Sequence, residues 1–284
     1  MKCLKWGLAV LLLIVLASCG GEARRVPPGG GFGSNVLWQD GRSEVSTYAG
    51  STEFGTGGYP ARARLVVSVR DLASARPSRG PADGRAFLLE FSIVSSDPAP
   101  GDSAVTAVSL RRRDLEPIEM NAVDVRGRDT VVISAAAMGT GSFRLMRGTR
   151  GGGGAERVAW ARWPAGDRPH VLWDALPLWL RQWAGEKRPI EMRVWLLPGL
   201  VSSLASGRGV TPVDATIRRL DGGTIQVPAG RFAAVEFAVA AGGQADAFWL
   251  NASYPHELLK VQTARHLTLE LLSTRRVAGP ERRP

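Results

Sequence analysis

The feature that most constrains the fold of this chain is a repeat of two in its apolar residues. Every second residue is apolar between Arg64 and Arg70, between Arg85 and Val94, and between His266 and Leu271. Side chains of a β-strand point alternately to opposite faces, so this pattern predicts antiparallel strands that bury one face. Further, less regular strands are predicted at residues 44–53, 104–111, 117–125, 130–134, 142–147, 157–163 and 190–197.

Turn residues separate the predicted strands of the C-terminal third. Asp221-Gly222-Gly223 lies between residues 215–220 and 224–227, and Gly242-Gly243 lies between residues 232–239 and 245–250. Both are typical of hairpins. In the segment 227–230, a proline and a glycine predict another tight turn. This third of the chain is therefore expected to form a meander.

One segment, residues 170–184, has a helical period instead. Its apolar residues recur at intervals of three and four, and Pro177 within it should kink the helix or start a second one. Such a helix either packs on the sheet as core or contributes stacking side chains to a ligand cavity, and packing is the favoured interpretation. The residues concerned are Trp173, Leu176, Trp179, Leu180 and Trp183.

The N-terminus has the pattern of an export signal. Lys2 and Lys5 precede an apolar run that is short for a transmembrane helix. The following residues, Leu16-Ala17-Ser18-Cys19, resemble the lipobox of bacterial lipoproteins. The resemblance implies cleavage before Cys19 and lipidation of its thiol. Gly20, in place of a retention aspartate, implies the outer membrane, facing the periplasm.

These features divide the chain into expected parts. Residues 1–18 form the signal peptide, 19–36 a flexible tether, 37–276 a single β-rich domain, and 277–284 a disordered tail. The domain could comprise two halves, 37–165 and 186–276, joined by the helix at 170–184. Because Cys3 lies in the signal and Cys19 is lipidated, no disulfide is expected.

Charge and motifs argue against several functions. The net charge of +10 comes from arginines scattered along the chain, without the aromatic interleaving of a nucleic-acid surface. We read it as mainly compositional, with weak attraction to anionic lipid headgroups. The three histidines, His170, His256 and His266, have no metal-ligand spacing, and no GxSxG or SxxK motif occurs. We predict no enzyme activity, no metal, no cofactor and no nucleic-acid partner.

The C-terminal seventy residues resemble the closing strands of an uncharacterised bacterial envelope family of unknown function. The resemblance rests on a V-x-A-G-x-F turn at 227–232 and a P-x-x-L-L-K strand at 255–260. The start at Trp38-Gln39-Asp40-Gly41 is also similar to exported lipoproteins of this kind. The resemblance implies the half-open barrel of periplasmic lipoprotein carriers. The expected fold class is mainly β, an antiparallel curved sheet or half-open β-barrel with one or two short helices packed on it.

Three functions are compatible with these residues. The first is a membrane-anchored periplasmic lipoprotein that binds a hydrophobic or lipid ligand in envelope maintenance. The second is a scaffolding lipoprotein with a filled core that acts through envelope protein partners, and the third is an envelope hydrolase. The inward-facing Phe87, Phe91 and Phe237, with the helix tryptophans, favour a filled interior.

Overall fold

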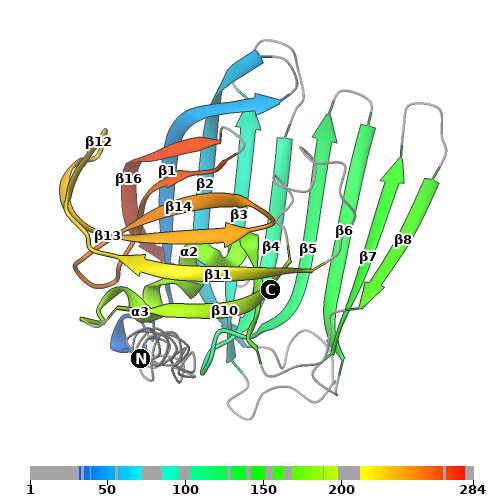
Figure 1. The fold of residues 1–284 in the computed structure, drawn as a ribbon, viewed down its shortest axis with the longest axis horizontal. Coiled ribbons are helices and arrows are strands. Elements are labelled where there is room, and N and C mark those ends of the chain that lie inside the picture. The colour runs from blue at the N-terminus through cyan, green and yellow to red at the C-terminus, as the bar shows by residue number, and fades with distance from the viewer. Residues whose placement is uncertain are drawn as a thin grey trace, which may run out of the picture.

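A computed structural model describes most of the predicted β-rich region (Figure 1). The described residues are 32, 35–38, 40–54, 57–71, 85–95, 103–126, 129–138, 142–150, 156–162, 168–187, 189–197, 212–264 and 267–278. The strands are β1 Arg42–Phe54, β2 Gly57–Asp71, β3 Arg85–Ser95, β4 Ser103–Arg111, β5 Pro117–Arg126, β6 Asp129–Met138, β7 Ser142–Arg150, β8 Glu156–Arg162, β9 His170–Leu172, β10 Glu191–Leu197, β11 Val213–Leu220, β12 Thr224–Val227, β13 Gly230–Ala241, β14 Gln244–Asn251, β15 Leu258–Gln262 and β16 Thr268–Ala278. The helical turns are η1 Val36–Trp38, η3 Trp173–Ala175, α2 Leu176–Trp179 and α3 Arg181–Ala184.

The strands form one open, curved sheet. Its order is β8-β7-β6-β5-β4-β3-β2-β1-β16-β15-β14-β13-β11-β10-β9, with β12 also paired to β13. Among the described strands, only β9 and β10 pair in parallel. The two ends of the sheet, β8 and β9, are consecutive in sequence but not hydrogen-bonded neighbours, so the sheet is not closed into a barrel. The predicted fold class is confirmed.

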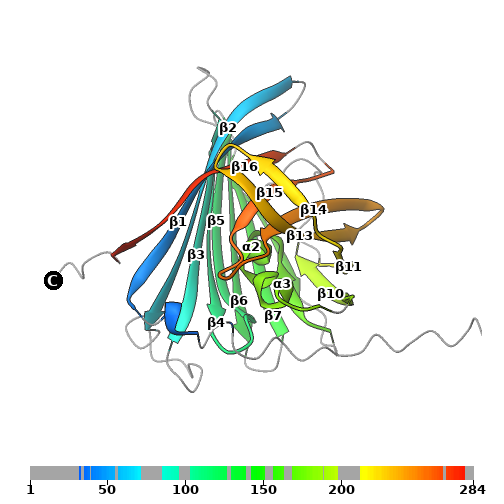
Figure 2. The same ribbon diagram turned by 90° about the vertical axis from the view of Figure 1, so that its left-hand side faces the viewer.

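The sheet wraps around the short helices. In Figure 2, α2 and α3 lie between the long strands β1–β7 and the strands β10–β14. The apolar residues of the predicted period-two runs, such as Leu65 and Leu89, face this interior and are buried. One contiguous hydrophobic core joins both halves of the sheet to the helices.

The helical segment begins later than its period predicts. His170–Leu172 form β9, which pairs with Trp195–Leu197 of β10, so the helix starts at Trp173 and not at residue 170. Pro177 lies in the first turn of α2, where a missing backbone N–H costs little. The predicted break near this proline is confirmed, because two separate helical turns follow each other.

One predicted hairpin is wrong. The strands β11 and β12 do not pair with each other across Asp221-Gly222-Gly223. They follow one another along the same edge of β13, with Leu220 opposite Glu236 and Thr224 opposite Ala233. A Cβ on Gly222 would lie 1.7 Å from the carbonyl oxygen of Ala234. The glycine therefore permits a close backbone approach within an interrupted strand. The turns at 228–229 and at Gly242-Gly243 do connect paired strands, as predicted.

The ordered region extends slightly beyond both predicted ends of the domain. Phe32, expected in the tether, is buried, and η1 begins at Val36. At the other end, Val277 and Ala278 belong to β16 and pair with Ser43 and Arg42, so these two residues are ordered strand and not tail. Cys19 and residues 1–18 lie outside the described residues, and the remaining domain boundaries stay predictions. No helix in the described part of the chain is long and apolar enough to cross a membrane.

Candidate functional site

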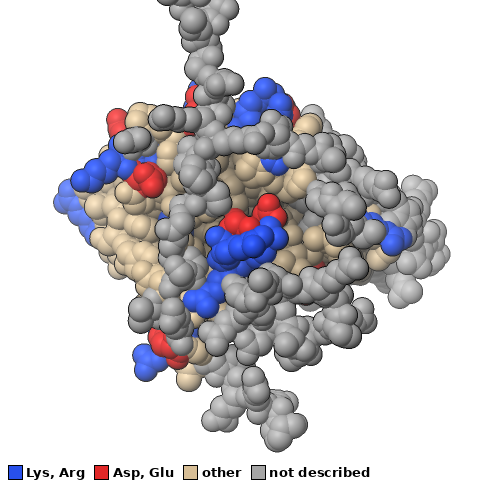
Figure 3. Space-filling model, turned by 90° about the horizontal axis from the view of Figure 1, so that it is seen from below, with Lys and Arg blue, Asp and Glu red and all other residues tan. Residues whose placement is uncertain are grey.

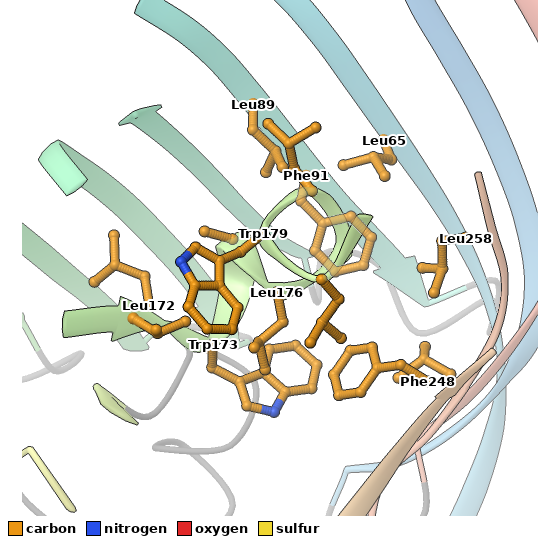
Figure 4. Packing of buried hydrophobic residues seen from close by; sticks show 14 of the residues in the cluster. Leu65, Leu89, Phe91, Leu172, Trp173, Leu176, Trp179, Phe248 and Leu258 are labelled. Carbon is orange, nitrogen blue, oxygen red and sulfur yellow. The ribbon is translucent and has the colours of Figure 1, made fainter. Parts of the chain in front are cut away.

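The structure brings the five predicted helix residues together in the packed core. Their relative exposures lie between 0 and 3%. Figure 4 shows side chains of this segment among those of the surrounding strands, with Trp173 beside Phe248 of β14. The members of this helix cluster are Trp173, Leu176, Trp179, Leu180 and Trp183.

Aromatic contacts fill the space around the helix cluster. The ring centroids of Trp173 and Phe248 lie 5.7 Å apart, and those of Trp179 and Trp183 lie 4.0 Å apart. The inward-facing Phe87, Phe91 and Phe237 are buried as well. The region expected to be either a cavity or a core is therefore occupied by the protein's own side chains around the helices.

A hydrogen bond ties the start of the helical segment to the C-terminal half of the sheet. The Trp173 indole N–H donates to Asp246 Oδ2 at 2.7 Å. Asp246 Oδ1 accepts the backbone N–H of Ala264 at 3.0 Å, which orients the carboxylate. This bond satisfies the polar atom of a side chain that is otherwise enclosed by apolar contacts.

A buried ion pair ties the end of the segment to the N-terminal half. Arg181 of α3 donates from Nη1 and Nη2 to the two carboxylate oxygens of Glu44 on β1, at 2.9 and 2.8 Å. Its Nε donates to the carbonyl oxygen of Pro177 at 3.0 Å. The side-chain exposures are 0% for Arg181 and 3% for Glu44. Burial by itself lowers the pKa of Arg181, but the Glu44 carboxylate outweighs it and raises that pKa above its usual value.

Polar groups surround this ion pair. The Tyr48 hydroxyl, four residues after Glu44 on β1, donates to the carbonyl oxygen of Leu258 at 3.2 Å. Burial raises the pKa of Tyr48 above its ordinary range. His256 has a left-handed φ of 60° and bonds through Nδ1 to the carbonyl oxygen of Asn251 at 2.9 Å. Burial lowers the pKa of His256. Burial therefore favours the neutral imidazole, which lies beside Gly185 at the end of α3.

The ion pair of Arg181 and Glu44 acts as a clamp that holds α3 to β1. The guanidinium of Arg181 makes three hydrogen bonds within the protein and is enclosed. Among the described residues, no group of three or more His, Cys, Asp and Glu side chains is arranged to hold a metal ion. His170 and His256 lie on β9 and in the loop before β15, and His266 lies outside the described residues.

A second aromatic cluster fixes the point where the predicted tether meets the sheet. Trp38 packs edge-on against Phe87 with ring centroids 5.2 Å apart, and Phe32 lies within 5.8 Å of Trp38. Arg276 of β16 stacks over Trp38 and donates from Nη2 to the carbonyl oxygen of Leu37 at 2.6 Å. The C-terminal strand therefore holds the N-terminal segment in place.

Surface charges alternate in sign where the described surface is seen from below. Figure 3 shows Lys and Arg side chains beside Asp and Glu side chains on this face. At the β4–β5 turn, Arg111 pairs with Asp114 at 2.7 Å and with Glu116. Such a turn is a hairpin end with opposed, partly exposed charges.

By sequence, this chain matches no protein-family model and no curated protein. By fold, it is similar to a solved structure described as a beta-barrel-like protein of a domain of unknown function, from Brucella abortus. The alignment covers 83% of this chain and 98% of that one, with 10% sequence identity and a TM-score of 0.45.

Proposed function

We propose that this chain is a membrane-anchored envelope lipoprotein without catalytic activity that acts as a scaffold through its outer surface. The observation that carries the proposal is the burial of Trp173, Trp179 and Trp183 inside the sheet. A half-barrel that carries acyl chains needs an apolar space open to them. Here the helix cluster occupies the interior. Hydrogen bonds to Asp246 and to Glu44 hold the helical segment there.

The anchor is proposed from the lipobox residues 16–19. Lipidation of Cys19 places two or more acyl chains on the mature N-terminus, which suffices for stable attachment to a bilayer. Gly20 supports a location at the outer membrane, facing the periplasm. The partners of the scaffold are then envelope proteins, and neither a cofactor nor a metal enters its action.

Mass spectrometry tests both parts of the proposal. We expect the N-terminus of the full-length protein, isolated from membranes of a bacterial host, to be an acylated Cys19, and the Cys19→Ala variant to be unmodified. A soluble chain beginning at Gly20 should co-purify with no stoichiometric lipid and bind no fluorescent fatty acid. An unmodified Cys19 would remove the anchor, whereas bound lipid would restore the carrier function and overturn the scaffold.

A cavity-forming variant gives a second test of ligand binding. Trp179→Ala removes a large side chain from the helix cluster, and apolar cavities of that kind can take up apolar molecules. We expect the fluorescent fatty acid to bind this variant and not the wild type. Equal binding by both would mean that the wild-type interior is already accessible.

A further inference from the structure

The outer face of the long strands carries a contiguous patch of exposed valines. Six large hydrophobic residues are exposed in the described part of the chain, and four of them lie here, with relative exposures of 37 to 49%. In Figure 2 this outer face is the side of β3–β6 that is turned away from α2 and α3. The valine patch consists of Val94, Val105, Val123 and Val132.

The register of the sheet makes the patch continuous. Val105 of β4 lies opposite Val123 of β5, which lies opposite Val132 of β6. Val94 lies diagonally next to Val105, since Val105 pairs with Ser92 two residues before it. Directly opposed residues on neighbouring strands are about 5 Å apart, so the side chains form one stripe. Single exposed apolar residues are ordinary, but a connected stripe marks a contact surface.

Arginines border the patch on its β2 side. Arg62 pairs directly with Val94, and Arg64 pairs with Ser92 in the same row as Val105. Both arginines are exposed. The acidic residues of this face, Glu90 and Glu119, lie four residues along their strands from Val94 and Val123.

We propose that the valine patch, with Arg62 and Arg64, contacts a bilayer surface that contains anionic phospholipids. Valine side chains suit the apolar boundary of the bilayer, while arginines at the rim pair with phosphate groups. The net positive charge, which remains after removal of the predicted signal peptide, disfavours a second copy of the chain as the occupant, because like charges repel. This inference rests on the proposed function, in which the N-terminus is lipid-anchored.

The predicted tether is long enough for this contact. Cys19 precedes Phe32 by 13 residues, a length that spans at most about 45 Å when extended. Phe87, which packs near Trp38 where the tether meets the sheet, is seven residues from Val94 along β3, a rise of about 23 Å. An anchored chain can therefore place its valine patch against the membrane that holds it.

Vesicle flotation with the soluble chain beginning at Gly20, which keeps every described residue, tests the contact without the anchor. We expect binding to vesicles of equal parts phosphatidylglycerol and phosphatidylcholine, and much weaker binding to phosphatidylcholine alone. The triple variant Val105→Thr, Val123→Thr and Val132→Thr keeps β-branched side chains and should lower the partition coefficient on the order of tenfold. Leu220→Thr, an exposed residue of β11, is the matched control and should bind as wild type.

A second pair of variants isolates the charge. Arg62→Gln with Arg64→Gln should reduce binding to the anionic vesicles by about fivefold for each arginine. Arg231→Gln with Arg113→Gln removes the same charge from other exposed sites and should have little effect.

Three results overturn the inference: equal binding by the patch and control variants, no binding to either vesicle, or a wild-type dimer in light scattering that the triple variant makes monomeric. The last would make the patch an interface between copies. The acylation measurement on Cys19 is independent. Acylation without vesicle binding removes only this inference, and vesicle binding without acylation removes only the anchor.

Discussion

The buried pair of Arg181 and Glu44 gives the sharpest prediction about stability. Replacing Arg181 by Met removes two charge-assisted hydrogen bonds, at 2.9 and 2.8 Å, and leaves the Glu44 carboxylate enclosed at 3% exposure. Breaking one side of such a pair costs about 3–5 kcal/mol in the free energy of unfolding. With an m-value of about 3 kcal/mol/M, the urea midpoint should fall by about 1–2 M. Tryptophan fluorescence follows the transition, because Trp183 lies on the same helix.

A double variant separates the pair from its surroundings. Arg181→Met with Glu44→Met leaves no buried charge, so most of the lost stability should return, apart from about 1 kcal/mol for the carbonyl of Pro177. The matched control is Arg218→Met, whose pair with Glu191 has side-chain exposures of 60 and 58%, and it should cost at most about 1 kcal/mol. If Arg181→Met costs no more than the control, or the double variant is no more stable than the single, the clamp argument fails.

Two further predictions concern the backbone and pH. Gly222→Ala should destabilise the fold by about 1–3 kcal/mol in urea unfolding, because its Cβ would meet the Ala234 carbonyl oxygen. Gly223→Ala, whose Cβ would have nothing within 4 Å, is the control and should be close to neutral. Equal effects of the two variants would refute the close-approach argument. Burial lowers the folded-state pKa of His256 below 6.5, so the unfolded chain binds more protons between the two pKa values. The free energy of unfolding should therefore be highest above pH 6.5 and fall as the pH drops through the folded-state pKa. His256→Asn, in which asparagine tolerates the left-handed φ, should reduce this fall. Parallel pH profiles of the variant and the wild type would contradict this argument.

Local patterns account for most of the strands but not for their partners. The alternation around Leu65 and Leu89 depends only on neighbouring residues, and the structure confirms it. The Asp221-Gly222-Gly223 segment has hairpin composition, yet its course depends on β13, which lies further along the chain. His170–Leu172 likewise become a strand through pairing with β10, an interaction that no helical or strand period reveals.

The helix cluster could be predicted from its spacing, whereas the clamp could not. Trp173 and Trp183 repeat at helical intervals, so their shared face is visible in the sequence. Arg181 has a charged neighbour only in three dimensions, since Glu44 lies on the first strand. On β1, polar Glu44 and Tyr48 face the interior, the reverse of what polarity suggests. The two-residue spacing of Glu44, Ser46 and Tyr48 shows that these residues share one face of β1. Which face of the strand points inward is set by the helix that packs against it.

The pairing of β1 with β16 also determines how this protein can fold. Arg42 lies opposite Ala278 and Ser51 opposite Thr268, so two strands from distant parts of the chain are joined in the middle of the sheet. Closing so long a loop costs entropy before any contact repays it, and contacts of this kind slow folding. The meander β1–β8 can form from local hairpins, but β1 remains an edge until β16 arrives. A chain of this topology therefore completes its sheet only after its last strand has been synthesised and has paired with its first.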